Sequence, residues 1–122
     1  MLVGIDLIEL DRIERALERH GERFKRRVFT EAERAYCDSK ANPAQSYAAR
    51  FAGKEAVGKE LGFGVYWTWQ EIEIAGRPKP GVRLSGRTAA AAERIGGGRI
   101  ELSMTHSREL AAAVAVVVPD AR

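Results

Sequence analysis

Three residues in the sequence do not fit the pattern of their neighbours, and each carries a side chain that could take part in chemistry. The first is Asp6, which interrupts the apolar, β-branched run of residues 1–10. A carboxylate in such a run is desolvated at considerable cost unless it meets a cation or several hydrogen-bond donors. Asp6 is therefore either a ligand for a cation or a structural residue that caps the next helix or pairs with an arginine.

The second residue is Glu55, which lies in a segment that we expect to form a long helix. At about 100° per residue it projects near Phe51, on the face that should be packed. Lys59 follows one turn later, so a partly buried ion pair is one interpretation. Arg50 and Lys54, on an adjoining side, support another, because two cations beside a carboxylate are typical of a site for a phosphorylated ligand and its metal.

The third residue is His106, in the segment SMTHS at the end of a predicted strand. Beside Ser103 and Thr105, a histidine in this position can anchor an anion or act as an acid or base. A structural histidine is the alternative. His20, on a charged helix, is interpreted as a surface residue.

Several other chemistries lack their motifs. The chain has no Walker-type phosphate loop and no G-x-G-x-x-G between a strand and a helix. It also has no Cys/His spacing that suits zinc and no G-x-S-x-G. If a metal is present, two carboxylates together with phosphate oxygens favour Mg²⁺, which prefers hard oxygen ligands and keeps waters.

The N-terminal half must position the first two of these residues. Residues 1–10 indicate a buried strand that leads into an amphipathic helix from Asp11, with a possible break near Gly21. Further helix starts are indicated by Thr30 and Glu33, which have capping-box spacing for a helix over 31–39, and by Asn42, Pro43 and Gln45, which open a long helix ending at Gly62.

The C-terminal half must position His106. The pattern predicts strands at 70–75, 82–86, 99–106 and 110–118, a turn at 76–81, and a helix over 87–95 that Ser85 caps and the glycines at 96–98 end. This order predicts one α+β domain over residues 1–122, with a small antiparallel sheet packed with a long helix and shorter helices. Because the last strand is almost wholly apolar, both its faces need cover, and we expect self-association.

Length and composition set the class of protein. The 122 residues suit one compact domain, and 45% hydrophobic with 30% charged residues is typical of a soluble globular chain. No apolar run approaches the roughly 20 residues of a membrane helix, and the N-terminus lacks the features of a signal peptide. The single cysteine, Cys37, cannot form an intramolecular disulfide. We therefore expect a cytoplasmic protein that makes no membrane contact.

The net charge of +3 does not indicate a class of partner, but the distribution of the charged residues is informative. Basic residues crowd one short stretch, namely Arg19, Arg23, Lys25, Arg26 and Arg27. Such a stretch is either a solvated helix face or a positive surface that attracts an acidic partner.

Four motifs together resemble the bacterial holo-acyl-carrier-protein synthases, which belong to the 4′-phosphopantetheinyl transferase family. The motifs are GIDLIEL at 4–10, RFAGKEAVGKELGFG at 50–64, GRP at 76–78 and SMTHS at 103–107. The similarity covers nearly the whole chain, in the order and at about the spacing of the family.

The resemblance implies an enzyme that moves the 4′-phosphopantetheine arm of coenzyme A to a serine of an acyl carrier protein and releases adenosine 3′,5′-bisphosphate. It implies a role in fatty acid biosynthesis. In the family, the acidic residues of the first two motifs hold Mg²⁺ on the pyrophosphate, which points to Asp6 and Glu55. Contacts to coenzyme A phosphates are implied for Arg50, Lys54, Lys59 and His106.

The resemblance also implies partners. Family members are typically homotrimers with active sites between subunits. Carrier proteins present acidic helices, so the docking surface is expected on Arg12, Arg23, Phe24 and Arg27. An aromatic insert, Tyr66, Trp67 and Trp69, has no implied role beyond the core or an interface.

Two other functions fit parts of the sequence. A basic module that binds nucleic acid would use the arginine-rich stretch, but it leaves Asp6 and Glu55 without a role and shows no recognised pattern, so no nucleic-acid partner is expected. A different Mg²⁺-dependent phosphotransferase would use the same two carboxylates on another donor.

Overall fold

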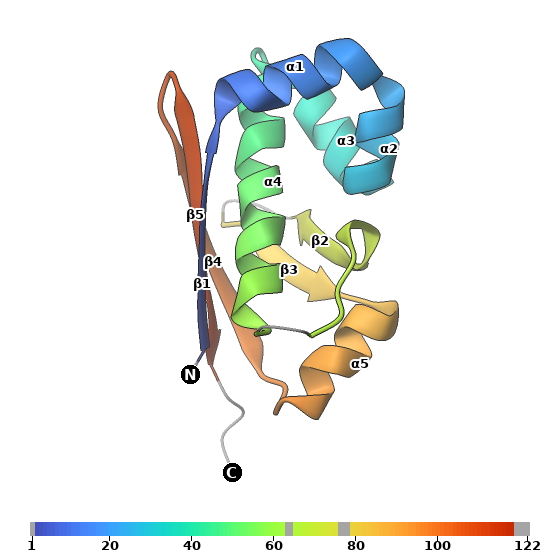
Figure 1. Cartoon of the computed structure of the whole chain (residues 1–122), viewed down its shortest axis with the longest axis vertical. Coiled ribbons are helices and arrows are strands. Elements are labelled where there is room, and N and C mark those ends of the chain that lie inside the picture. The colour runs from blue at the N-terminus through green and yellow to red at the C-terminus, as the bar shows by residue number, and fades with distance from the viewer. Residues whose placement is uncertain (1, 63–64, 76–78, 119–122) are drawn as a thin grey trace.

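The fold is built around one long helix that runs alongside a three-stranded sheet and packs against one of its faces (Figure 1). The computed structural model describes residues 2–62, 65–75 and 79–118. The elements in chain order are β1 (Leu2–Glu9), α1 (Leu10–His20), α2 (Glu22–Val28), α3 (Glu31–Asp38), α4 (Pro43–Glu60), the 3-10 turn η1 (Trp69–Glu71), β2 (Ile72–Ala75), β3 (Gly81–Leu84), α5 (Gly86–Arg94), β4 (Arg99–His106) and β5 (Leu110–Val118). The predicted α+β class is confirmed.

The sheet has the strand order β1-β5-β4, with both pairs antiparallel. The last strand therefore lies in the middle, and the first strand forms one edge. Asp6 pairs with Ala113, which in turn pairs with Met104, so these three residues form one row across the sheet. A second, two-stranded sheet pairs β2 with β3.

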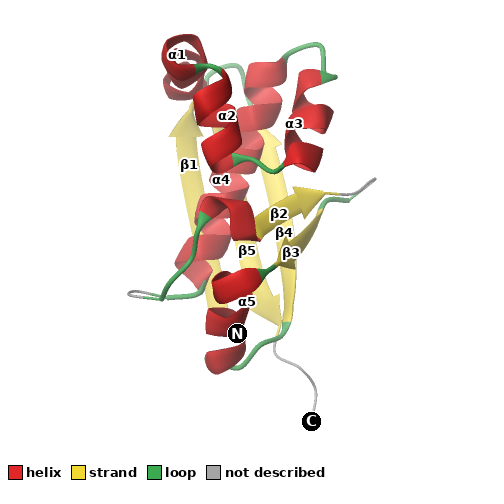
Figure 2. Cartoon of the chain, turned by 90° about the vertical axis from the view of Figure 1, so that its right-hand side faces the viewer, coloured by secondary structure: helices red, strands yellow, loops and turns green. Residues whose placement is uncertain are grey.

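Short helices cover one end of α4, and the β2-β3 hairpin with α5 lies beside its other half (Figure 2). The core between α4 and the main sheet is lined by small side chains on both sides. They include Ala52 and Ala56 of the helix and Ala111, Ala113 and Ala115 of β5, all buried. Small residues let a helix approach a sheet closely, and this positions the α4 backbone over β1 and β5.

Most sequence signals for helix ends are confirmed. Thr30 and Glu33 form the reciprocal capping box of α3, and the Asn42 side chain accepts a hydrogen bond from the Gln45 backbone N–H at the start of α4. The predicted break occurs at Gly21, whose φ of 49° separates α1 from α2. Helix α4 ends at Glu60, two residues earlier than predicted.

The predicted cap of α5 is wrong in one respect. Ser85 occupies the N-cap position, but its side chain makes no capping hydrogen bond. The Glu71 carboxylate, from η1, instead accepts hydrogen bonds from the backbone N–H groups of Thr88 at 2.9 Å and Arg87 at 3.2 Å. A carboxylate also complements the positive end of the helix dipole, so a residue distant in sequence replaces the local cap.

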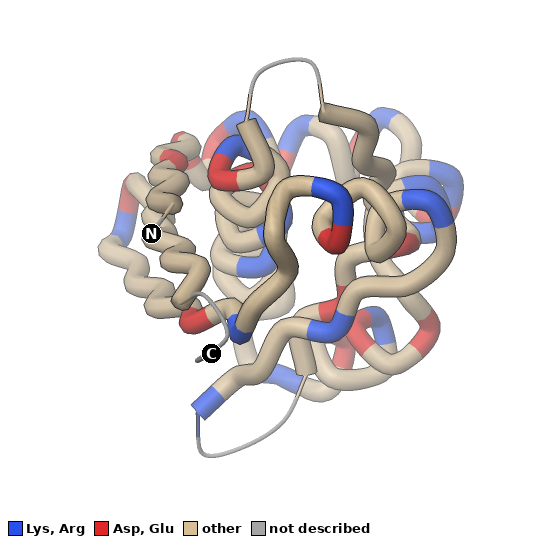
Figure 3. The backbone as a smooth tube through the Cα atoms, turned by 90° about the horizontal axis from the view of Figure 1, so that it is seen from below, with Lys and Arg blue, Asp and Glu red and all other residues tan. Residues whose placement is uncertain are grey.

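One face of the main sheet is left uncovered by the part of the chain that the structure describes. Val3, Ile5 and Leu7 of β1 are 60%, 64% and 61% exposed, and Val114 of β5 is also exposed. Figure 3 shows few charged residues along these strands. The described helices include none long and apolar enough to cross a membrane. The GRP segment at 76–78 lies outside the described residues.

Candidate active site

Strand β1 contacts the backbone of α4 directly at Gly4. A Cβ atom built on Gly4 would overlap the carbonyl oxygen of Ala56 and would lie 2.7 Å from the backbone nitrogen of Glu60. Only a residue without a side chain fits here. This close approach brings the next inward-facing residue of β1, Asp6, alongside the C-terminal part of α4.

Asp6 meets Lys59 at this contact. The Lys59 Nζ atom donates a 2.8 Å hydrogen bond to Asp6 Oδ1 and a 3.3 Å hydrogen bond to the Ile5 carbonyl. The Asp6 side chain is 12% exposed, whereas that of Lys59 is 54% exposed. The pair is therefore open to solvent on the lysine side, and the hydrogen bond to Asp6 raises the pKa of Lys59.

Glu55 lies one helical turn before Lys59 and is half-buried. Burial raises the pKa of its carboxyl group, the nearby Asp6 carboxylate raises it further, and Lys59 lowers it. The Coulomb effect of Asp6 means that the two carboxylates lie within electrostatic range of each other. The structure thus brings together Asp6, Glu55 and Lys59, although about fifty residues separate the first from the other two.

Two carboxylates of this kind fit a hard divalent cation. The described residues include no group of three or more His, Cys, Asp or Glu side chains that could hold a metal by themselves. Mg²⁺ suits such a partial set, because it is usually bound through one or two carboxylates and completes its octahedron with waters and substrate phosphates. A cation would also relieve the repulsion that Asp6 exerts on the ionised form of Glu55.

Lys54 has a different environment from the one expected. Its side chain is fully buried, and its Nζ atom lies 2.6 Å from Glu33 Oε1. It also donates to the carbonyl oxygens of Trp69 at 2.8 Å and Ile72 at 2.7 Å. All three ammonium protons are therefore used inside the protein, on the side of α4 that faces α3 and β2.

Arg50 and His106 also lie apart from the acidic pair within one chain. Arg50 is 6% exposed and stacks on the Tyr36 ring of α3, with 4.1 Å from its guanidinium carbon to the ring centre. His106 is exposed at the end of β4 and pairs with Ala111, which pairs with Ile8 of β1. Two strand spacings, about 10 Å, therefore separate His106 from the strand that carries Asp6.

Sequence reasoning missed the residues that hold the site in place. Gly4 was not singled out, and Glu33 was predicted only as a capping residue of α3, not as the ion-pair partner of Lys54. Trp67 packs its ring against Gly58, where any Cβ atom would overlap it, and Trp69 stacks on Phe51 at 4.9 Å. A glycine inside a strand is a general sign of close backbone approach, and this signal could have identified Gly4.

The residues expected at a docking surface line two neighbouring hollows on α1 and α2. Arg23, Phe24 and Arg27 surround one hollow together with His20. Arg12 lines the next, which also includes His20. The structure therefore brings these residues into one continuous basic region with an aromatic ring within it.

Comparison with known proteins assigns the class. Residues 2–115 match the family model described as the 4′-phosphopantetheinyl transferase superfamily. The chain belongs to this superfamily and is a transferase enzyme, so the resemblance seen in the sequence is confirmed.

Within this superfamily, the chain is similar to proteins named as holo-[acyl-carrier-protein] synthases. The chain is similar to the holo-[acyl-carrier-protein] synthase of Chlamydia trachomatis serovar D, at 47% identity over 117 residues that cover 93% of this chain and 96% of the relative. Its fold matches the crystal structure of the synthase from Neisseria meningitidis, with a TM-score of 0.86, 28% identity and 97% and 99% of the two chains covered. The Helicobacter pylori synthase in complex with coenzyme A matches with a TM-score of 0.83, 29% identity and 96% and 100% coverage.

Proposed function

We propose that this protein is a holo-[acyl-carrier-protein] synthase, which transfers 4′-phosphopantetheine from coenzyme A to a serine of an apo acyl carrier protein and releases adenosine 3′,5′-bisphosphate. The convergence of Asp6, Glu55 and Lys59 is the observation that carries the proposal. The relatives named as synthases and the coenzyme A complex of one of them support the choice of substrates.

Asp6 and Glu55 would hold Mg²⁺ against the pyrophosphate of coenzyme A. When bound, the ion neutralises charge on the pyrophosphate and orients the phosphorus that is attacked. Asp6 suits this role because its side chain is largely buried and its strand is anchored on α4 at Gly4. A carboxylate on a rigid element holds its position better than one on a mobile loop.

Lys59 would contribute a mobile positive charge. More than half of its side chain is exposed, so its ammonium group can move from Asp6 to a phosphate oxygen. The Mg²⁺ held by Asp6 would then compensate the largely buried carboxylate that the lysine leaves. Charge-assisted hydrogen bonds to phosphate are stronger than neutral ones, and they stabilise the charge that develops on the leaving group.

The serine hydroxyl of the carrier protein must lose its proton to become a nucleophile. We assign Glu55 as the acceptor, through the carboxylate oxygen that would not bind Mg²⁺, because it is the half-buried carboxylate beside Asp6 at this site. A general base must lie within hydrogen-bond reach of the proton that it accepts.

His106 would contact a coenzyme A phosphate from a neighbouring subunit of a homotrimer. Within one chain it lies on β4, which β5 separates from the strand that carries Asp6. The uncovered apolar face formed by Val3, Ile5, Leu7 and Val114 supports self-association, since burial of such side chains stabilises an interface. Lys54 has no exposed surface for a phosphate, and we assign it a structural role with Glu33.

The basic region of α1 and α2 would dock the carrier protein. Arg12, Arg23 and Arg27 supply positive charge, and Phe24 supplies an apolar contact between them. Opposite charges on the two surfaces would accelerate encounter more than they tighten the final complex.

Mass spectrometry of an apo acyl carrier protein incubated with enzyme and coenzyme A tests the proposal. Phosphopantetheinylation adds about 340 Da to the carrier, as estimated from the formula of the transferred group. We expect this shift with Mg²⁺ and its loss with a chelator. We also expect its loss in Asp6→Asn and Glu55→Gln, while Glu18→Gln, which removes a remote exposed carboxylate, keeps it. An unmodified carrier with the wild-type enzyme and Mg²⁺ would refute the proposal.

A further inference from the structure

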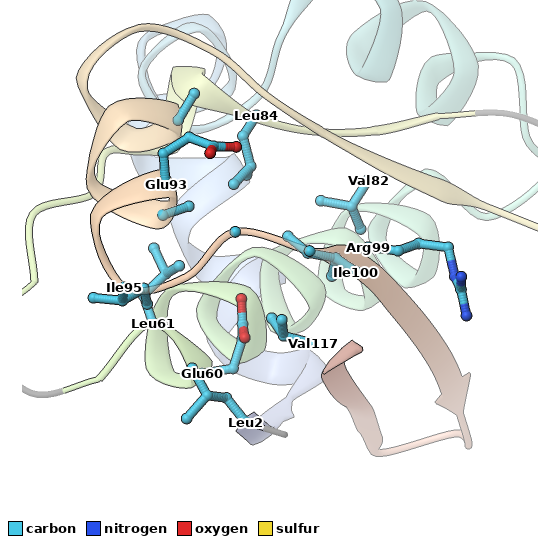
Figure 4. Close-up of a pocket in the computed structure, with 14 residues that line it drawn as sticks. Leu2, Glu60, Leu61, Val82, Leu84, Glu93, Ile95, Arg99, Ile100 and Val117 are labelled. Atoms are coloured by element: carbon cyan, nitrogen blue, oxygen red, sulfur yellow. The ribbon is translucent and has the colours of Figure 1, made fainter. Parts of the chain in front are cut away.

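A cavity that none of the proposed active-site residues lines lies at the C-terminal end of α4. It has a volume of about 300 Å³ and lies between the end of α4, helix α5 and the adjoining ends of β1, β4 and β5 (Figure 4). This volume is at the lower end of the range for small-molecule sites. Apolar side chains form most of its wall, namely Leu2, Leu61, Val82, Leu84, Ile100 and Val117.

Glu60 places a carboxylate in the otherwise mainly apolar wall of this cavity. Its side chain points into the cavity (Figure 4) and it is only 2% exposed. Neither carboxylate oxygen has a hydrogen-bond partner among the residues that the structure describes. Burial raises the pKa of Glu60 to about 7, because its ionised form has no compensating partner within these apolar walls.

A second carboxylate faces the same space from α5. Glu93 points toward the cavity in Figure 4, and its two oxygens lie 3.2 and 3.3 Å from the position that a Cβ atom of Gly97 would occupy. Gly97 thus leaves room for this carboxylate at the mouth of the cavity. The nearby cation, Arg99, points away in Figure 4 and lies 3.6 Å from Glu101.

We propose that this cavity binds a small hydrophobic ammonium ion, with the ammonium group on Glu60 and the apolar body against the surrounding side chains. The two carboxylates supply the charge complementarity, and the apolar wall supplies the surface for a hydrocarbon group. A cation would give Glu60 the partner that residues 2–62, 65–75 and 79–118 do not supply.

This site is separate from the one proposed for coenzyme A. Glu60 follows Glu55 by five residues, which places it about 140° around the helix and about 7.5 Å along it. Asp6, Glu55 and Lys59 do not line the cavity. The inference therefore does not depend on the proposed function.

Isothermal titration calorimetry with the 2-phenylethylammonium ion tests the inference, without coenzyme A or carrier protein. The neutral comparison ligand is 3-phenylpropan-1-ol, which has a similar apolar body and no charge. Glu60→Gln removes the buried charge with little change in shape, Ala92→Phe fills the cavity from α5, and Glu18→Gln is the matched control on α1. Circular dichroism melts identify variants that are folded.

We expect the ammonium ion to bind the wild type and Glu18→Gln equally, and to bind Glu60→Gln about tenfold more weakly or not at all. Ala92→Phe should lose binding although Glu60 is kept. The inference is overturned if the wild type does not bind the ion, if Glu60→Gln binds it as well as the wild type, or if the alcohol binds as tightly as the ion.

Discussion

A side chain at Gly4 would overlap the main-chain carbonyl of Ala56, so the backbone of β1 rests on that of α4. This contact sets the distance between the strand that carries Asp6 and the helix that carries Glu55 and Lys59. Because two backbones meet without side chains between them, the site depends on a residue that has no functional group.

Gly4→Ala should therefore impair both folding and activity. The added methyl group has no space and forces β1 away from α4, at a cost of about 1–3 kcal/mol. We expect a lower urea midpoint and a larger fractional loss of carrier modification than of folded protein. Gly81→Ala is the matched control, because its Cβ would meet only the Ala75 carbonyl at an ordinary 3.7 Å. Equal behaviour of the two variants would argue against this role of Gly4.

Lys59→Met should weaken coenzyme A binding more than it changes stability. Its own side chain is 54% exposed, and the bound Mg²⁺ would compensate the charge of the Asp6 carboxylate, which is 12% exposed and loses its lysine. We expect KM for coenzyme A to rise by about tenfold, the effect of one lost charge-assisted hydrogen bond to phosphate. Steady-state kinetics provide the measurement, and Lys79→Met, at an exposed lysine, is the control. An unchanged KM would exclude a phosphate contact.

Lys54→Met should lower the free energy of unfolding and should not directly weaken coenzyme A binding. It leaves the Glu33 carboxylate fully buried without its cation, which typically costs about 3–5 kcal/mol. The double variant Glu33→Gln/Lys54→Met should recover part of this loss, as measured by denaturant unfolding. If Lys54→Met instead kept full stability and raised KM for coenzyme A, Lys54 would bind a phosphate as the sequence suggested.

Glu60→Gln should change the pH dependence of stability. Burial raises the pKa of Glu60 to about 7 in the folded protein, above the ordinary value of about 4.3 that applies in the unfolded chain. The folded state therefore holds the proton more tightly than the unfolded chain does. As the pH rises from about 4 to about 7, the free energy of unfolding of the wild type falls by on the order of 3 kcal/mol. Glu93 and Arg99 are the other charged groups that line this cavity.

The variant lacks this titration, so its stability relative to the wild type should be higher at pH 8 than at pH 5. Urea unfolding at the two pH values measures the difference, in which the other titrating groups cancel. A difference that does not change with pH would mean that Glu60 titrates normally.

Ile5→Glu should dissociate the protein if the uncovered sheet face joins subunits. Ile5 is 64% exposed in the single chain, and a buried carboxylate at this position would face apolar side chains in an assembly. Light scattering should give three times the chain mass of 13.5 kDa for the wild type and a lower mass for the variant. Ile95→Glu, at another exposed isoleucine, should keep the wild-type mass. A monomeric wild type would rule out the homotrimer.

Local sequence signals determined most of the secondary structure. The capping box at Thr30, the helix start at Asn42 and the break at Gly21 depend on contacts within a few residues, and the structure confirms all three. The two misfit carboxylates were also evident without a structure, because a charged residue in an apolar pattern is visible from its neighbours alone. The cap of α5 was not evident from the sequence, because the carboxylate that accepts its N–H hydrogen bonds, Glu71, comes from another element.

Only the tertiary structure decided which charged residues meet. Lys54 and Lys59 are five residues apart on one helix, yet one is buried against Glu33 and the other reaches Asp6. Their spacing places them on different sides of α4, and the partners on each side come from distant parts of the chain. Charge pairing depends on separation in space and on burial, and the sequence specifies neither until the strands and helices have packed.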